Sequence, residues 1–221
     1  MDAVLKVGGS LAEDPNKLTN LCQELTLLAK NHRIVIVPGG GKFADAIRKF
    51  EETYDLSDIA AHKMAILAMD QYGLFLSDIT PDSNVSYLLE ETSNLMKGKL
   101  PIFLPSQLIL SEDPLENSWD VTSDTIAAYI AGKLNAQKVV LVTDVDGIFF
   151  EDPKKTLDTK LVEELSAKEL QGWNKRTSVD KILPKMLLKT KMDCYVVNGK
   201  YPERIRLILE NKPTICTHIK L

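Results

Sequence analysis

The sequence predicts an α/β protein, a three-layer α-β-α sandwich with a mainly parallel central sheet. Short apolar runs alternate with segments of helical periodicity along all 221 residues, which is typical of strands connected by helices. The runs are continuously apolar, as expected for parallel strands that are buried on both faces. Several runs end at glycine or proline, residues that terminate strands.

In the first half, strands are predicted where apolar runs meet turn residues. Val4–Val7 runs into Gly8 and Gly9, and Ile34–Val37 stops at Pro38 and three glycines. Helices are predicted where apolar residues recur at intervals of three and four positions. In order, we expect strand 4–7, helix 15–31, strand 34–37, helices 43–52 and 57–77, a short helix near 85–95, and strand 102–104.

The second half repeats the alternation after a polar loop at 111–120. Thr122 or Ser123 is a suitable N-cap for a helix over 123–135, and the β-branched run 138–143 predicts a strand. The remaining expected elements are helices 163–171 and 180–192, strand 194–197, helix 202–210 and strand 214–217.

No repeat, low-complexity tract or long linker divides the chain. We therefore expect a single domain over 1–221 that is built from two lobes, residues about 1–118 and about 119–221. The second lobe begins where a new series of strands and helices starts.

Composition and charge narrow the class of partner. The net charge is −4, which argues against nucleic acid because binding to a phosphate backbone requires a basic face. No apolar run approaches the length of a membrane span, and no basic leader precedes the first strand. Three scattered cysteines without ligand spacing predict reduced thiols. We expect a cytoplasmic protein that contacts neither nucleic acid nor membrane.

Two glycine loops follow the first two predicted strands. The first is Lys6-Val7-Gly8-Gly9-Ser10 and the second is Pro38-Gly39-Gly40-Gly41-Lys42. Ligands of open α/β sheets bind beyond the carboxyl ends of the strands, and glycines there let backbone N–H groups approach a phosphate. The simpler alternative is that the glycines only form turns.

The second loop does not match a P-loop and matches a dinucleotide-binding motif only in part. A P-loop that ends at Lys42 would require glycine at Ile36 and Ser or Thr at Phe43. Gly39, Gly41 and Ala44 satisfy a dinucleotide-binding fingerprint, but the segment that follows is predicted to be helical instead of a second strand. Nicotinamide binding therefore remains a weaker alternative.

Four segments together resemble the amino acid kinase family. They are Lys6–Ser10 at the first strand, Pro38–Gly41 after the second, Asp120–Asp124 before a helix, and Leu141–Gly147. Their order and spacing match across nearly the whole chain. The resemblance implies the amino acid kinase fold and transfer of the γ-phosphoryl group of ATP, with Mg²⁺ held mostly by phosphate oxygens and water.

The resemblance also implies roles for individual residues. Lys6 resembles a lysine that bridges donor and acceptor phosphates, and Asp124 resembles the aspartate that positions two such lysines. Lys185 is the better candidate for the second lysine and Lys181 the alternative, because the usual glycines before this helix are replaced. The expected ATP-binding residues are Lys6, Gly8, Gly9, Ser10, Thr143, Asp144, Asp146, Gly147 and Lys185. No metal-ligating residue is expected.

The acceptor is expected to be a small phosphorylated molecule. The chain looks most like a small archaeal branch of the family, which includes the methanofuran-pathway kinase acting on [5-(aminomethyl)furan-3-yl]methyl phosphate. That phosphomonoester is the favoured acceptor, to be converted to a diphosphate. The expected acceptor-binding residues are Gly39, Gly40, Gly41, His62, Asp120 and Asp180.

Other functions remain open at this point. Uridylate, isopentenyl phosphate and amino-acid kinases share the motifs, although an acceptor carboxylate usually requires arginine and none lies in the glycine loops. A non-catalytic nucleotide-binding protein on the same fold is a further alternative. The resemblance suggests a homo-oligomer, and the apolar helix 57–77 could contribute to its interface.

Overall fold

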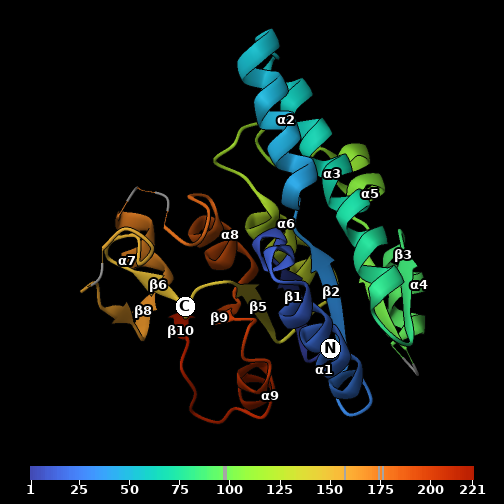
Figure 1. The fold of residues 1–221 in the computed structure, drawn as a ribbon, viewed down its shortest axis with the longest axis vertical. Coiled ribbons are helices and arrows are strands. Elements are labelled where there is room, and N and C mark those ends of the chain that lie inside the picture. Colours follow the sequence, from blue (N-terminus) through green and yellow to red (C-terminus); the bar gives the residue numbers. More distant parts are fainter. Residues whose placement is uncertain (97–98, 157, 174, 176) are drawn as a thin grey trace.

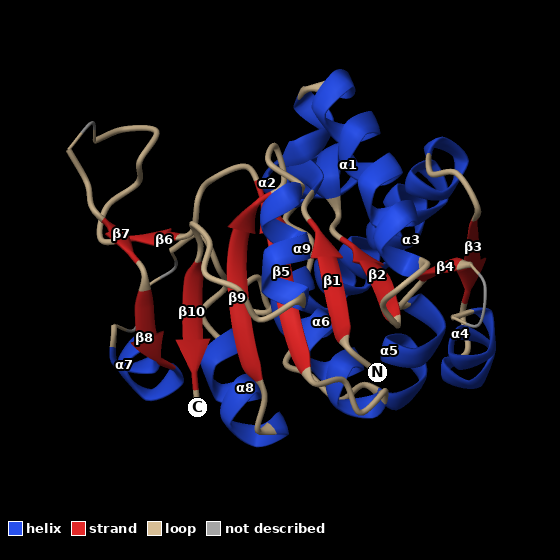
Figure 2. Cartoon of the chain, turned by 90° about the horizontal axis from the view of Figure 1, so that it is seen from below, coloured by secondary structure: helices blue, strands red, loops and turns tan. Residues whose placement is uncertain are grey.

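A computed structural model describes residues 1–96, 99–156, 158–173, 175 and 177–221. Its centre is an eight-stranded sheet with the strand order β3-β4-β2-β1-β5-β9-β10-β8 (Figures 1 and 2). The strands are β1 (Ala3–Val7), β2 (Ile34–Pro38), β3 (Ser83–Ser86), β4 (Leu100–Phe103), β5 (Lys138–Thr143), β8 (Glu164–Ser166), β9 (Asp193–Asn198) and β10 (Thr217–Lys220). A small separate ribbon contains β6 (Ile148–Phe149) and β7 (Leu161–Val162).

Strand β1 lies inside the sheet between β2 and β5, and both pairings are parallel. All described pairings in the large sheet are parallel except β9 with β10. The predicted fold class is therefore confirmed. Parallel pairing matters for function because it brings the carboxyl ends of β1, β2 and β5 to one edge.

Helices cover both faces of the sheet (Figure 2). They are α1 (Pro15–Ala29), α2 (Gly41–Tyr54), α3 (Asp58–Ile79), α4 (Leu89–Leu95), α5 (Ser106–Glu112), α6 (Ser123–Lys133), α7 (Ala167–Gly172), α8 (Leu183–Thr190) and α9 (Glu203–Leu209), with a 3-10 helix η1 (Gly9–Glu13).

The side chains of β1 point alternately to the two faces of the sheet and enter two apolar cores. Leu5 and Val7 pack with residues of α1 and α9 on one face, and Val4 packs with residues of α6 and α8 on the other. Successive side chains of a strand point to opposite faces, so a sheet that is apolar on both faces must be covered twice. The three-layer prediction follows directly from this pattern.

Several short elements differ from the sequence-based expectation. The polar strand β3 and the helices η1 and α5 were not expected, and only 89–95 of the predicted segment 85–95 is helical. Strand β3 is an edge strand that pairs with β4 alone. Because β4 supplies its backbone hydrogen bonds, β3 forms without the apolar and β-branched side chains from which a strand is predicted.

The C-terminal region also contains corrections. The predicted strand 214–217 is wrong in register, because the strand covers 217–220. Ile219 is fully buried whereas Ile215 is 52% exposed, so burial selects the later segment. The predicted helix 163–171 is divided into strand β8 and helix α7, which starts at a capping box between Ser166 and Glu169.

Helices α2 and α3 pack along each other and project beyond the rest of the molecule (Figure 1). Helix α2 begins at the third glycine of the second loop and therefore starts at the ligand-binding edge. No helix in the described part of the chain is both long and apolar enough to cross a membrane.

Candidate functional site

The two glycine loops touch each other at the carboxyl edge of the sheet. The Gly39 N–H donates a hydrogen bond to the Val7 carbonyl at 2.8 Å, and Gly41 has a φ of +53°, a conformation that favours glycine. A methyl group on Gly9 would lie 2.1 Å from the Cα of Gly41. Glycine is therefore required for the loops to approach this closely.

We expect Gly9→Ala to destabilise the protein by about 1–3 kcal/mol, because the added methyl group forces the two loops apart. The phosphoryl transfer that the resemblance implies should slow by more than the loss of folded protein accounts for, because the loops shape the cavity edge. Chemical denaturation and steady-state kinetics would measure the two effects. Gly172→Ala is the matched control, because a methyl group there meets no atom within 4 Å.

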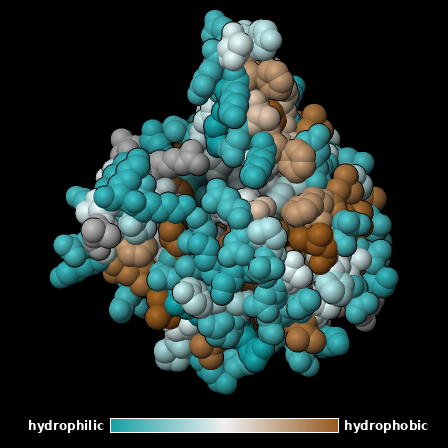
Figure 3. All heavy atoms as spheres, in the orientation of Figure 1, coloured by the Kyte–Doolittle hydropathy of each residue, from teal (hydrophilic) through white to brown (hydrophobic). Residues whose placement is uncertain are grey.

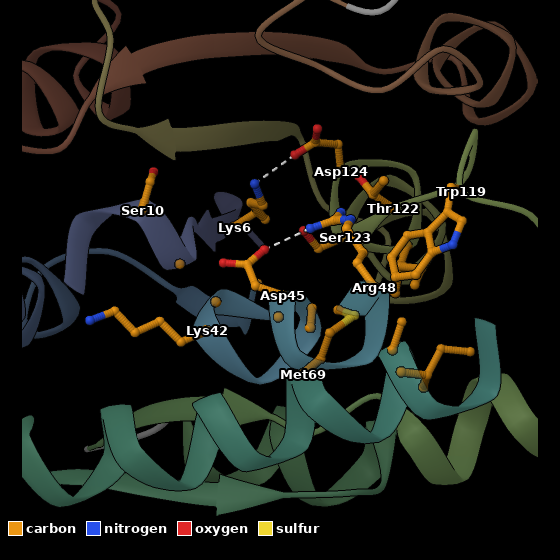
Figure 4. A pocket seen from close by; sticks show the side chains of 18 of the residues that line it. Lys6, Ser10, Lys42, Asp45, Arg48, Met69, Trp119, Thr122, Ser123 and Asp124 are labelled. Carbon is orange, nitrogen blue, oxygen red and sulfur yellow. Dashed lines mark hydrogen bonds and ion pairs between the residues drawn. The ribbon is translucent and has the colours of Figure 1, made fainter. Parts of the chain in front are cut away.

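A cavity of about 300 Å³ opens beside the touching loops (Figure 4). Its walls come from the two loops, from α2 and α3, and from the start of α6. The predicted site residues that line it are Lys6, Gly9, Ser10, Gly39, Gly40, Gly41, His62 and Asp124. The structure thus brings together residues that are far apart in the sequence.

The Lys6 side chain projects from β1 toward the first turn of α6. Its Nζ lies 2.8 Å from Oδ1 of Asp124, and both side chains are largely removed from solvent. Oδ1 has no hydrogen-bond partner in the described residues beyond this ion pair. The pair positions a single ammonium group at the cavity wall, where it can neutralise phosphate charge.

Asp180 positions Asp124 instead of lining the cavity. Its backbone N–H donates a hydrogen bond to Asp124 Oδ2 at 3.1 Å. Asp180 as a whole residue is only 2% exposed. Its carboxylate accepts hydrogen bonds from Thr122 and Thr125 at the start of α6 and from the backbone leading into α8. The expectation that Asp180 contacts the acceptor is therefore corrected to a structural role.

Electrostatics around Asp180 follow from this burial. Removal from solvent raises the pKa of Asp180, and the neighbouring Asp124 carboxylate adds to the rise. The donors of Thr125 and Thr122 act in the opposite direction by stabilising the ionised form. A buried carboxylate with this many donors fixes the loop before α8 against the start of α6.

A second cavity, of about 430 Å³, lies between the end of β5 and the segment before α8. It is lined by Thr143, Asp144, Val145, Phe149, Phe150, Glu151, Asp152, Pro153, Lys154, Lys175, Thr177 and Ser178. Aromatic, acidic and basic groups are thus combined, which suits a nucleotide's base, ribose and phosphates. Ser178 also lines the first cavity, so the two cavities are adjacent.

Asp144 connects the second cavity to the first glycine loop. Its carboxylate accepts a hydrogen bond from the Ser10 hydroxyl at 3.1 Å and forms an ion pair with Lys154. Burial alone would raise the pKa of Asp144, but Lys154 and Ser10 outweigh it and hold the pKa below its ordinary value. Asp144 is therefore ionised at neutral pH and holds a lysine at the cavity mouth.

Three further residues predicted for ATP binding lie outside the lining of both cavities, namely Asp146, Gly147 and Gly8. Asp146 accepts hydrogen bonds from Asn198 and Arg204 and does not line either cavity. A side chain at Gly147 would collide with Thr217, its Cβ lying 2.3 Å from the hydroxyl oxygen. Gly8 likewise lies outside the cavity lining, with its N–H bonded to the Val142 carbonyl.

The lysines near α8 lie away from Lys6. Lys185 is mostly exposed and is 3.9 Å from Glu116, and Lys181 pairs with Asp120 at 3.2 Å. None of these residues lines the two cavities already described. In this conformation the structure therefore brings neither lysine to Asp124, and it places Asp120 in a surface ion pair.

The first cavity is also lined by charged and aromatic residues that were not among the predicted site residues. Lys42, Asp45 and Arg48 lie on α2 and Trp119 lies in the loop before α6, and all four line the wall (Figure 4). The α2 residues follow the third glycine at intervals of three, which places them on one helix face. That spacing was a usable signal, whereas Trp119 is brought there only by the tertiary fold.

His62 is buried at 6% exposure in the cavity wall. Desolvation lowers the pKa of His62, and this outweighs the opposing effects of Ser118 and Asp113. The imidazole is therefore neutral at neutral pH. It can offer the acceptor a hydrogen bond but not a charge.

The lowered pKa of His62 predicts a pH dependence of stability. Below the ordinary histidine pKa the unfolded chain binds a proton that the folded chain does not, so stability falls as pH falls from about 7 toward 5. Replacing His62 by Gln should flatten this slope by up to about 1.4 kcal/mol per pH unit. Denaturant titrations at several pH values would measure it, and equal slopes for both proteins would contradict the prediction.

Known proteins with similar sequences and folds define the class. The amino acid kinase family matches residues 1–198. The [5-(aminomethyl)furan-3-yl]methyl phosphate kinase of Methanocaldococcus jannaschii is 38% identical over 98% of this chain and 96% of its own length. The uridylate kinase of Methanococcoides burtonii is 26% identical over 91% of this chain and 88% of its own.

Solved structures agree on the fold. The uridylate kinase from Archaeoglobus fulgidus superimposes with a TM-score of 0.77 at 23% identity and covers 99% of this chain and 100% of its own. This chain belongs to the amino acid kinase family, and it is a kinase. The resemblance inferred from the four motifs is thereby confirmed.

Proposed function

We propose that this protein transfers the γ-phosphoryl group of ATP to a small phosphomonoester and forms a diphosphate. The favoured acceptor is [5-(aminomethyl)furan-3-yl]methyl phosphate, on which the relative with 38% identity acts according to its name. The observation that carries the proposal is the Lys6–Asp124 ion pair at the wall of the first cavity. A positioned ammonium group there can bridge two phosphates during transfer.

The two cavities suggest that each lobe binds a different substrate. The second cavity is formed by residues 143–178 alone, and we assign it to the nucleotide. The first cavity combines the glycine loops, α2 and α3 with the start of α6, and we assign it to the acceptor and the transferred phosphate. This division supports an acceptor lobe over about 1–118 and an ATP lobe over about 119–221.

Magnesium would accompany ATP at the junction of the cavities. No group of three or more His, Cys, Asp or Glu side chains in the described residues is arranged to hold a metal ion. Mg²⁺ commonly keeps several waters and binds nucleotide phosphates with one or two carboxylates. Phosphate oxygens and water would supply its ligands here, with Asp144 as a nearby acidic group.

The charge of the first cavity favours a phosphorylated acceptor. Lys6 and Lys42 line it together with the backbone of the second glycine loop, and ammonium and backbone N–H groups are donors that bind phosphate. Uridylate kinase relatives at about a quarter identity also match this chain over most of its length. Uridylate is therefore the second acceptor to test.

Measurement of ADP release tests this proposal. Purified protein with ATP and Mg²⁺ should release ADP in the presence of the aminomethylfuran phosphate, and more slowly or not at all with uridylate, isopentenyl phosphate or N-acetylglutamate. Turnover with a carboxylate alone would overturn the phosphomonoester assignment. No turnover with any acceptor would favour a nucleotide-binding protein without catalytic activity.

We also expect a homo-oligomer formed through the projecting helices. Leu67, Leu74 and Phe75 of α3 and Phe50 and Tyr54 of α2 are exposed, and Figure 3 shows apolar side chains along this helix pair. Exposed apolar patches on soluble proteins often mark interaction sites. A second copy of the chain offers the same apolar face for isologous packing.

Light scattering after size-exclusion chromatography tests the oligomer. The wild type should have a mass that is a multiple of the 24.7 kDa chain, and Leu74→Glu should lower it. Leu88→Glu is the matched control, because Leu88 is 60% exposed at the start of α4 and belongs to neither α2 nor α3. A monomeric wild type would contradict the expectation.

A further inference from the structure

Three side chains of α2 hold the loop before α6 against the first cavity. Arg48 Nη1 lies 2.8 Å from Asp45 Oδ1, and the Arg48 guanidinium stacks 4.4 Å from the Trp119 ring centroid. The Trp119 indole N–H donates to Glu51 at 2.6 Å. Figure 4 shows Asp45 and Arg48 extending from α2, with Arg48 between Asp45 and Trp119. The cavity wall therefore already accommodates a cation between a carboxylate and an aromatic ring.

The carboxylates that line this cavity differ in their availability. Asp124 is paired with Lys6, and Glu13 lies at the end of the 3-10 helix η1 instead of on α2. Asp45 remains on the acceptor side. Only its Oδ1 is paired, whereas Oδ2 has no hydrogen-bond partner among the described residues. The Asp45 side chain is 61% exposed, so Oδ2 can accept a hydrogen bond from a cationic ligand.

Position along α2 separates this carboxylate from the phosphate-binding loop. A helix rises 1.5 Å per residue, so Asp45 lies about 6 Å beyond Gly41 along the helix axis. A ligand with phosphate at the glycine loops would extend along α2 toward Asp45 and Trp119. Ala65, Ile66 and Met69 line the same cavity and give it an apolar surface for a ring.

We propose that Asp45 determines acceptor specificity by binding an ammonium group at the end of the acceptor that lies away from its phosphate. The inference rests on the proposed function, which assigns this cavity to a phosphomonoester. It adds the residue that recognises the primary amine of that acceptor, at the end of the small ring opposite the phosphate. A charge-assisted hydrogen bond from the ammonium to Oδ2 favours acceptors with an amine over acceptors without one.

Two acceptors and three variants test the proposal. The acceptors are [5-(aminomethyl)furan-3-yl]methyl phosphate and the analogue in which a methyl group replaces the aminomethyl group. Asp45→Asn should raise KM for the amine about 10- to 100-fold and change KM for the analogue less than about threefold. Glu52→Gln, the same charge change on α2 outside the cavity lining, should affect neither acceptor.

Arg48→Gln distinguishes direct binding from an indirect effect. If Asp45 binds the ammonium itself, this variant keeps the wild-type preference for the amine. Loss of that preference in Arg48→Gln, or an equal loss with both acceptors in Asp45→Asn, would overturn the proposal by showing that Asp45 acts through Arg48. A wild type that turns over the analogue as well as the amine would also overturn it. A wild type that neither binds nor phosphorylates either acceptor would reject the proposed function and this inference with it.

Discussion

Lys6→Ala should reduce kcat by about a thousandfold, because its ammonium group acts on charge that develops during phosphoryl transfer. The KM for each substrate should change much less, since the loops and the other cations still bind the ground state. The residue is positioned by Asp124 at 2.8 Å in the wall of the cavity assigned to the acceptor. Steady-state kinetics at saturating ATP would measure the effect.

Controls must separate catalysis from stability at this position. Removing Lys6 leaves the buried Asp124 carboxylate without its cation, which costs about 1–3 kcal/mol. The double variant Lys6→Ala, Asp124→Asn removes that uncompensated charge and should recover stability but not activity. If Lys6→Ala retained wild-type kcat, or if the double variant restored it, Lys6 would have no role in transfer.

Asp180→Ala should produce the largest loss of stability, about 3–5 kcal/mol. The carboxylate accepts hydrogen bonds from Thr122, Thr125, Ile182 and Leu183 in a fully desolvated position. Its removal leaves these donors unsatisfied at the starts of two helices. Activity should fall as well, because the start of α6 carries Asp124.

Asp120→Ala is the matched control for Asp180→Ala. Asp120 is half-exposed and forms a surface ion pair with Lys181, so its loss should change stability by less than about 1 kcal/mol. Urea denaturation of both variants would measure the difference. Equally small losses of stability in both variants would show that the hydrogen bonds of Asp180 contribute little. A large rise in the acceptor KM of Asp120→Ala would show that Asp120 binds the acceptor.

The fold was largely predictable because its dominant signals are local. Buried parallel strands such as 34–38 read as continuous apolar runs, and helices such as 15–29 carry a clear apolar stripe. Elements held by neighbours were missed. Strand β3 depends on β4 for its hydrogen bonds, and the register of β10 depends on which isoleucine the sheet buries.

The candidate site was predictable only where sequence motifs carry it. Glycines and Lys6 adjoin strand ends, so their proximity follows from parallel topology. Asp180 is different, because nothing in a single sequence indicates that its carboxylate binds the start of α6. Arg48 of α2 stacks on Trp119 of the loop before α6, and a contact between such distant segments is visible only in the tertiary structure.

Phosphorus NMR of the reaction product tests the central claim most directly. With ATP, Mg²⁺ and the aminomethylfuran phosphate, the account predicts a pair of mutually coupled resonances from a new diphosphate monoester, together with ADP. Lys6→Ala should form this product about a thousandfold more slowly. ADP with inorganic phosphate alone, or no change in the acceptor resonance, would contradict transfer onto a phosphate acceptor at this site.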